Sequence, residues 1–243
     1  MLASDSLPSM RDYAQLEQQL TDVLNLSRRP VAIAFRDAAP SGVEALAGTQ
    51  PSGCSFWRLA AAGRAFYTVP SDHYNCPVGS YTHNIPLPKE REAELAGTLT
   101  MMVNIGYLRM EEVPGIPRLP STPAVTIYAP LGSTPVDPDA VLISGTPAKL
   151  MLLHEAATRA DKTPLPMLGR PTCMAIPAAL TLGVASSLGC VGNRVYTGVS
   201  DNEFYSVIAG DDLNSVMAPL DTVVSANAQL ATYHTERRTM AST

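Results

Sequence analysis

The sequence is poor in charged residues and has no excess of basic ones. Only 16% of its 243 residues are charged, and 17 lysines and arginines face 22 aspartates and glutamates, for a net charge of -5. Nucleic-acid-binding domains usually carry a basic surface, so this composition argues against that class of partner. Hydrophobic residues form 46% of the chain, which is an ordinary share for a globular protein and excludes disorder over the whole length.

Long apolar stretches are absent as well. No segment approaches the ~20 consecutive apolar residues that a membrane-spanning helix needs. The first residues, Met1 to Arg11, include Asp5 and lack the basic segment and apolar core of a secretory signal. We therefore expect a cytoplasmic protein that does not bind membranes.

Motifs of several common enzyme classes are missing too. There is no GxSxG elbow, no Walker loop, no GxGxxG run and no Ser/His/Asp order. Serine hydrolases, P-loop proteins and Rossmann-type dinucleotide-binding domains consequently have no support from motifs.

Cysteine is scarce, with only four in the chain: Cys54, Cys76, Cys173 and Cys190. Four are too few for a disulfide scaffold, and in a reducing compartment they would be free thiols, metal ligands or catalytic groups. They do not form the paired knuckles of a zinc module. Each lies beside Gly, Pro or Thr, at an expected junction between a loop and a regular element, where thiolates can ligate soft metals or iron–sulfur clusters.

Two other interpretations of the cysteines stay open at this point. Cys76 could be a metal-free nucleophile with His73 as its base, since His73 lies three residues earlier; His83 follows in the same segment. The four cysteines could also be small buried hydrophobic residues of a binding module.

Two arginines follow cysteines at the same offset. Arg58 comes four residues after Cys54, and Arg194 four residues after Cys190. Such arginines could bind an anionic substrate or offset the charge of a thiolate-bound cluster, so we include Arg58, Arg194 and His73 among the candidate catalytic residues.

The apolar pattern predicts alternating helices and strands. Helices are expected over residues 10–26, 53–60, 88–107, 147–158 and 213–234, and strands over 30–35, 66–69, 124–128, 140–144 and 204–209. This interleaving favours an α/β or α+β fold, a layered mixed β-sheet with flanking helices. We expect one domain over residues 1–243, with the cysteines in segments 53–83 and 170–194.

Several motifs together resemble the prokaryotic family of domain of unknown function 169. They are Cys54-Ser-Phe-Trp-Arg58, Gly63-Arg-x-Phe-Tyr67, His73-Tyr-Asn-Cys76-Pro-Val-Gly79, Ala129-Pro-Leu131 with Pro138-Asp139, and Gly189-Cys-Val-Gly-Asn-Arg194. The resemblance extends from the first strand to the last helix. It implies that the cysteine segments belong to one shared site.

A shared four-cysteine site favours an iron–sulfur cluster, such as a 4Fe-4S cluster, over zinc or no metal. Four ligands would make the cluster an electron carrier or a structural group, whereas three would leave one iron open for Lewis-acid chemistry such as desulfuration or hydration. We favour an enzyme over a small-molecule binding module or complex subunit. Expected partners are a small-molecule substrate or a redox partner, and a second copy of the chain.

Overall fold

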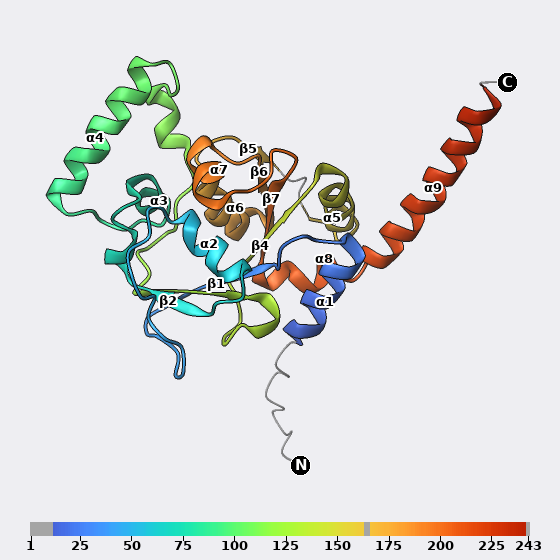
Figure 1. Cartoon of the computed structure of the whole chain (residues 1–243), viewed down its shortest axis with the longest axis horizontal. Coiled ribbons are helices and arrows are strands. Elements are labelled where there is room, and N and C mark those ends of the chain that lie inside the picture. The colour runs from blue at the N-terminus through green and yellow to red at the C-terminus, as the bar shows by residue number, and fades with distance from the viewer. Residues whose placement is uncertain (1–11, 163–165, 242–243) are drawn as a thin grey trace, which may run out of the picture.

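A seven-stranded sheet forms the centre of the protein (Figure 1). The structure, a computed structural model, describes residues 12–162 and 166–241. The strand order is β2-β3-β1-β4-β7-β6-β5, and every neighbouring pair is antiparallel except β5 and β6. The strands are β1 (Val31–Arg36), β2 (Phe66–Thr68), β3 (Val125–Pro130), β4 (Ala140–Gly145), β5 (Met167–Leu168), β6 (Val184–Ser187) and β7 (Phe204–Ala209).

Helices cover both faces of the sheet. The α-helices are α1 (Tyr13–Leu24), α2 (Cys54–Ala61), α3 (Pro77–Thr82), α4 (Lys89–Asn104), α5 (Pro147–Arg159), α6 (Ala175–Leu182), α7 (Val191–Thr197), α8 (Leu213–Met217) and α9 (Leu220–Met240). Short 3-10 helices include η1 (Pro70–His73), η2 (Met110–Gly115) and η4 (Thr172–Met174). The layered mixed sheet with flanking helices confirms the predicted fold class.

Alternation along the central strands builds two cores. In β4, Val141 and Ile143 pack with α1, α5 and α8 on one face. Ala140 and Leu142, on the other face, pack with α2 and α6. Successive side chains of a strand point to opposite faces, so a strand buried on both faces is apolar throughout.

The seam between β4 and β7 joins the two parts of the sheet. β2, β3, β1 and β4 come from the first 145 residues, and β7, β6 and β5 from the last third of the chain. At the end of this seam the Gly210 amide donates a hydrogen bond to the Asp139 carbonyl oxygen, at 2.7 Å. The two parts of the sheet therefore meet along one antiparallel ladder.

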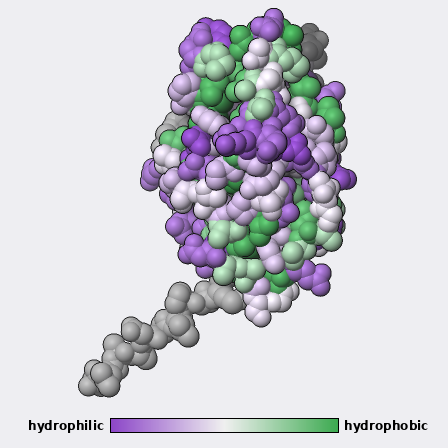
Figure 2. Space-filling model, turned by 90° about the vertical axis from the view of Figure 1, so that its left-hand side faces the viewer, coloured by the Kyte–Doolittle hydropathy of each residue, from purple (hydrophilic) through white to green (hydrophobic). Residues whose placement is uncertain are grey.

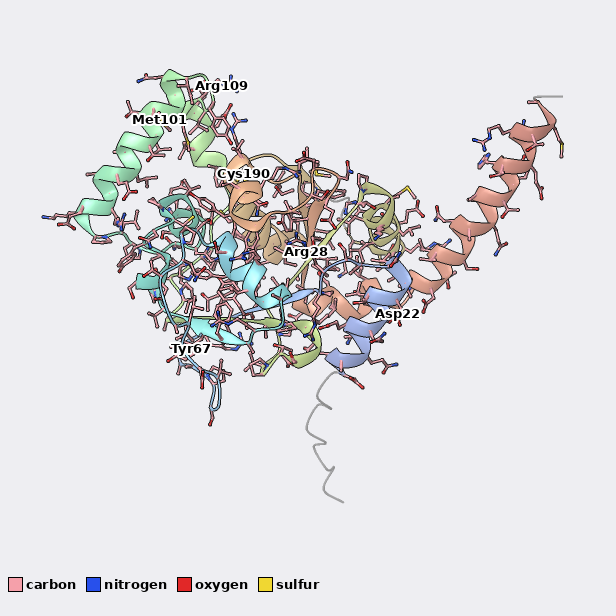
Figure 3. All side chains as sticks on the ribbon, viewed as in Figure 1. Asp22, Arg28, Tyr67, Met101, Arg109 and Cys190 are labelled. Atoms are coloured by element: carbon pink, nitrogen blue, oxygen red, sulfur yellow. The ribbon has the colours of Figure 1, made fainter. Side chains whose placement is uncertain are left out.

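The α4 arm, residues 89–115, extends from the body of the protein (Figure 1). The helix expected over 88–107 is observed as Lys89–Asn104, and none of its residues is buried. Met101 and Arg109 lie on the arm's outer part (Figure 3), and its side of the molecule mixes hydrophilic and hydrophobic residues (Figure 2). The arm is attached by few contacts, among them the Arg91 hydrogen bond to Asn75 at 2.9 Å.

Some element boundaries differ from the sequence prediction. The expected N-terminal helix 10–26 is observed as Tyr13–Leu24, with residues 10 and 11 outside the described part. The closing helix expected over 213–234 is two helices, because Pro219 lies between α8 and α9. β5 and β6 were not predicted. In the described ranges, no helix combines the length and apolarity needed to cross a membrane.

Candidate functional site

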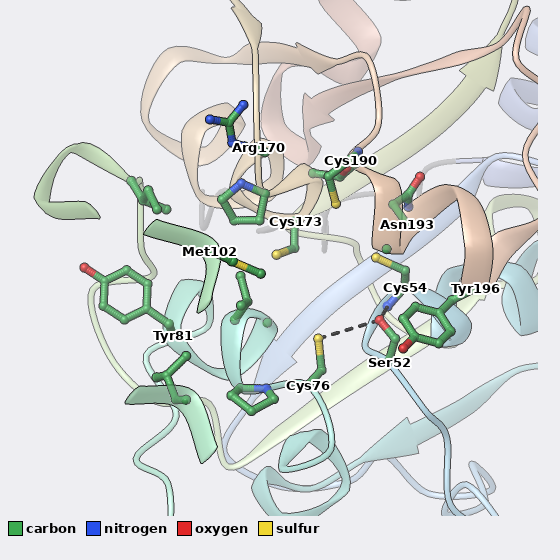
Figure 4. A pocket seen from close by; sticks show the side chains of 18 of the residues that line it. Ser52, Cys54, Cys76, Tyr81, Met102, Arg170, Cys173, Cys190, Asn193 and Tyr196 are labelled. Atoms are coloured by element: carbon green, nitrogen blue, oxygen red, sulfur yellow. Dashed lines mark hydrogen bonds between the residues drawn. The ribbon is translucent and has the colours of Figure 1, made fainter. Parts of the chain in front are cut away.

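All four cysteines line one cavity of about 400 Å³ (Figure 4). Its wall is formed by α2, α3 and α7, by η4, and by the inner side of the α4 arm. The four cysteines are free thiols, and Cys54 and Cys173 are buried. Residues that lie up to 136 positions apart in the sequence, Cys54 and Cys190, thus come together at one site.

The first two cysteines lie where helices begin, as their sequence contexts predict. Cys54 is the first residue of α2, and Cys76 is the N-cap of α3, with Pro77 in the first helical position. The Ser52 hydroxyl links them, because its Oγ accepts a hydrogen bond from the Cys54 amide at 3.3 Å and lies 3.6 Å from the Cys76 Sγ.

The other two cysteines come from the last third of the chain. Cys173 is in η4, and Cys190 is the N-cap of α7. The Cys190 amide donates a hydrogen bond to the Thr172 Oγ1 at 2.6 Å, which fixes the start of α7 against η4. Figure 3 shows Cys190 at the start of α7, close to where the α4 arm meets the body. Ser52 therefore connects Cys54 with Cys76, and Thr172 connects Cys190 with the 3-10 helix that carries Cys173.

Burial holds the deep thiols in their neutral form. Desolvation raises the pKa of Cys54 to about 12, and the neighbouring Cys76 and Cys190 act in the same direction. Desolvation, followed by the influence of Cys54 and Cys76, also raises the pKa of Cys173. A thiol with a raised pKa is a poor nucleophile near neutral pH, but a bound cation would favour the thiolate form.

The thiols surround a space and do not converge on a point. Among residues 12–162 and 166–241, no three His, Cys, Asp or Glu side chains are arranged to hold a single metal ion. Tetrahedral zinc needs its sulfur ligands about 2.3 Å from one point. A cluster has several irons, each with its own thiolate, so its cysteines stand further apart. Among the described residues the four thiols thus share one cavity without forming a site for a single metal ion.

Gly79, which has no side chain, leaves the space in which the Cys76 thiol lies. A Cβ atom added to Gly79 would lie 2.9 Å from the Cys76 Sγ, which is closer than real Cβ contacts. Gly79 is buried in α3, one turn after Cys76, so the backbone of this turn packs directly on the sulfur. A side chain at residue 79 would therefore displace the Cys76 sulfur.

We expect Gly79→Ala to move the Cys76 thiol and to change its rate of alkylation, without unfolding the protein. Gly97→Ala in α4 is the matched control, since its added Cβ would have no atom within 4 Å. Alkylation rates and circular dichroism of the two variants and the wild type, measured side by side, check this prediction. Equal alkylation of Cys76 in Gly79→Ala and the wild type would contradict it.

The three candidate catalytic residues from the sequence do not line this cavity. The His73 Nε2 lies 2.9 Å from the Thr68 Oγ1, and its ring packs on Phe56 in the core. Arg58 lies in a different, small hollow beside Arg28 and Arg29. Its side chain is exposed, one turn after the buried Cys54, and it does not reach the cavity of the cysteines.

Arg194 has a structural role instead. Its guanidinium donates hydrogen bonds to the carbonyl oxygens of Ser200 at 2.9 Å, Leu188 at 2.5 Å and Glu203 at 3.2 Å. These contacts pin the loops on both sides of α7. The arginine thus supports the helix that carries Cys190, and it is not among the described residues that line the cavity.

Sequence reasoning missed Arg170, Tyr107 and Asn193, which do line the cavity. Arg170 stacks on the Tyr107 ring with 4.4 Å between the guanidinium carbon and the ring centroid. The Asn193 side chain acts to lower the pKa of Cys54 against the larger effect of burial, and its Nδ2 and Oδ1 are buried without a hydrogen-bond partner among the described residues. The available signal was the position of Arg170, three residues before Cys173, as His73 precedes Cys76.

Comparison with known proteins places the site in a family context. The model of DUF169, described as uncharacterised ArCR, matches residues 19–218. The chain belongs to the DUF169 family. All four cysteines fall within the span that matches the DUF169 model. The chain is also similar to the uncharacterized protein MJ0308 of Methanocaldococcus jannaschii, with 24% identity over 221 residues that cover 84% of this chain and 91% of that protein. No solved structure matches this DUF169 chain.

Proposed function

We propose that this protein holds an iron–sulfur cluster at Cys54, Cys76, Cys173 and Cys190, and that it carries out redox or Lewis-acid chemistry on a small molecule. The observation that carries this proposal is the convergence of all four cysteines, from four separate segments, on one cavity. Cysteines that served only as packing residues would have no reason to share one cavity and to face it.

The bound cluster would supply a redox couple or, with one iron free of protein ligands, a Lewis acid for desulfuration or hydration. The chain's own residues would exclude water and orient the thiols. The mostly apolar wall of the cavity keeps water from the thiolates, which strengthens their interaction with a cation. Ser52 and Thr172 orient the thiols through the backbone amides of Cys54 and Cys190.

The metal-free alternative, with Cys76 as nucleophile and His73 as base, receives less support from the geometry. Desolvation lowers the pKa of His73 to about 3, and its Nε2 faces Thr68. We also propose a cytoplasmic location, because four free thiols at one site suit a reducing compartment.

The experiment is purification of the full chain without oxygen, followed by iron, sulfide and zinc analysis and a visible absorption spectrum. We expect iron and sulfide in stoichiometric amounts and broad visible absorbance from charge transfer between thiolate and iron. The four single Cys→Ser variants then count the ligands. Loss of iron in all four indicates four protein ligands, and retention in one variant identifies the cysteine beside an open iron.

The proposal fails if the protein is colourless, contains neither iron nor sulfide after reconstitution under the same conditions, and keeps all four thiols free to react. Stoichiometric zinc without sulfide would also contradict it. Circular dichroism of every variant separates loss of the cofactor from loss of the fold.

A further inference from the structure

The cavity beside the cysteines has an apolar wall that lacks a packing partner. Leu95, Leu99 and Met102 follow one side of α4 at spacings of four and three residues and line the cavity. None of them is buried, although an apolar helix side normally packs against another element. These three side chains on the inner side of the α4 arm are therefore available to contact a ligand in the cavity.

The size of the cavity suits a small organic molecule. Its volume of about 400 Å³ would hold on the order of a dozen groups the size of water, at about 30 Å³ each. It also lies in the range of roughly 300–1,000 Å³ typical of ligand pockets. A molecule with about a dozen non-hydrogen atoms would fill this volume when no cofactor is bound.

Arg170 gives this apolar cavity one charged group. Among the described residues that line it, Arg170 carries the only charged side chain. Arg170 lies at the exposed edge of the cavity and forms a long ion pair, with its Nη2 3.7 Å from the Glu112 Oε2. The other oxygen of that carboxylate, Oε1, accepts a hydrogen bond from the Arg109 Nε at 2.9 Å. A bound carboxylate would give the planar donors of Arg170, held on the Tyr107 ring, two parallel hydrogen bonds in place of this long ion pair.

We propose that the cavity binds a small monocarboxylate with an apolar body, its carboxylate on Arg170 and its body along Leu95, Leu99 and Met102. This inference rests on the proposed function in one respect: the bound molecule is the substrate of the cysteine-held cofactor. A single arginine in an otherwise apolar wall matches one negative charge. The thiols of Cys173 and Cys190 lie on the same side of the cavity as Arg170 (Figure 4), so the carboxylate end of the molecule faces the cofactor.

The test is calorimetric titration of the full chain, purified without oxygen, with decanoate and with decanol. We expect the wild type to bind decanoate at least about tenfold more tightly than decanol, because only the carboxylate can pair with Arg170. Arg170→Gln is expected to remove that preference and leave decanol binding unchanged. Leu99→Asn is expected to weaken both ligands. Arg159→Gln, an exposed arginine at the end of α5, is the control for loss of a positive charge.

Equal affinity of the wild type for decanoate and decanol, or no binding of either, would overturn this inference. So would a decanoate preference that survives in Arg170→Gln. The same titrations on protein stripped of metal separate the two proposals. Iron and sulfide without a decanoate preference would leave the proposed function standing and remove the substrate class, whereas a decanoate preference without iron would do the reverse.

Discussion

Replacing Gly210 by alanine is expected to destabilise the fold by more than about 3 kcal/mol, the upper end of ordinary overpacking. An added Cβ would stand 1.7 Å from the Pro138 carbonyl oxygen and 2.8 Å from its carbonyl carbon. Both are backbone atoms, so no side-chain rotation relieves the clash. The Gly210 hydrogen bond to Asp139, at the end of the seam between β4 and β7, would have to lengthen or break.

Urea unfolding of the wild type, Gly210→Ala and Gly97→Ala checks this prediction. Gly97 is in α4 with no atom near its added Cβ, so Gly97→Ala should be neutral or more stable by up to about 1 kcal/mol. A Gly210→Ala variant as stable as the wild type would show that the backbone of residues 138–139 can move aside at little cost.

Acidification from pH 7.5 to pH 5 is expected to cost the protein about 4 kcal/mol of stability, from two buried histidines. Burial lowers the pKa of His73 from 6.5 to about 3, with His83 acting in the same direction, and lowers the pKa of His83 to about 4. Their rings lie 5.7 Å apart, so protonation of one opposes protonation of the other.

The direction follows from the binding of protons. Below pH 6.5 the unfolded chain takes up protons at these two residues, and the folded chain does not until the pH falls to about 4 and then about 3. Stability is therefore complete above pH 6.5 and declines between pH 6.5 and pH 3, by about 1.4 kcal/mol per pH unit for each histidine while it stays neutral in the fold.

Urea midpoints at a series of pH values test this dependence. His83→Gln is expected to flatten the curve by about half, because it removes one of the two neutral imidazoles. His234→Gln, an exposed histidine on α9, should keep the curve of the wild type. A wild-type midpoint that stays constant between pH 7.5 and pH 5 would contradict the prediction.

The sequence predicted elements wherever a pattern had a clear period or a clear end. The strand over 204–209 is observed with those bounds, and the N-terminal helix was found because Leu20 and Leu24 are spaced for one buried side. β6 was missed because it has only four residues, Val-Ala-Ser-Ser, and follows the apolar α6 with only Gly183 between them. So short a segment after an apolar run shows no clear strand period.

The candidate site was predictable in its cysteines and not in its surroundings. Neighbouring Gly, Pro and Thr residues indicated that the cysteines lie at junctions between loops and regular elements, and the structure has Cys54, Cys76 and Cys190 at helix starts. The directions of the arginine side chains could not be predicted from the sequence. A fixed offset from a cysteine says nothing about which way a side chain points, whereas the contact of Arg170 with Tyr107 depends on the α4 arm folding back over η4.

The seam between β4 and β7 also sets when the cysteine site can exist during synthesis. A ribosome releases the segment with Cys54 and Cys76 first, while Cys173 and Cys190 follow about a hundred residues later. β7, which aligns the two parts of the sheet, is translated after all four. A nascent chain therefore exposes two thiols without their partners, and a cofactor that needed all four could be loaded only after β7 has left the ribosome and paired.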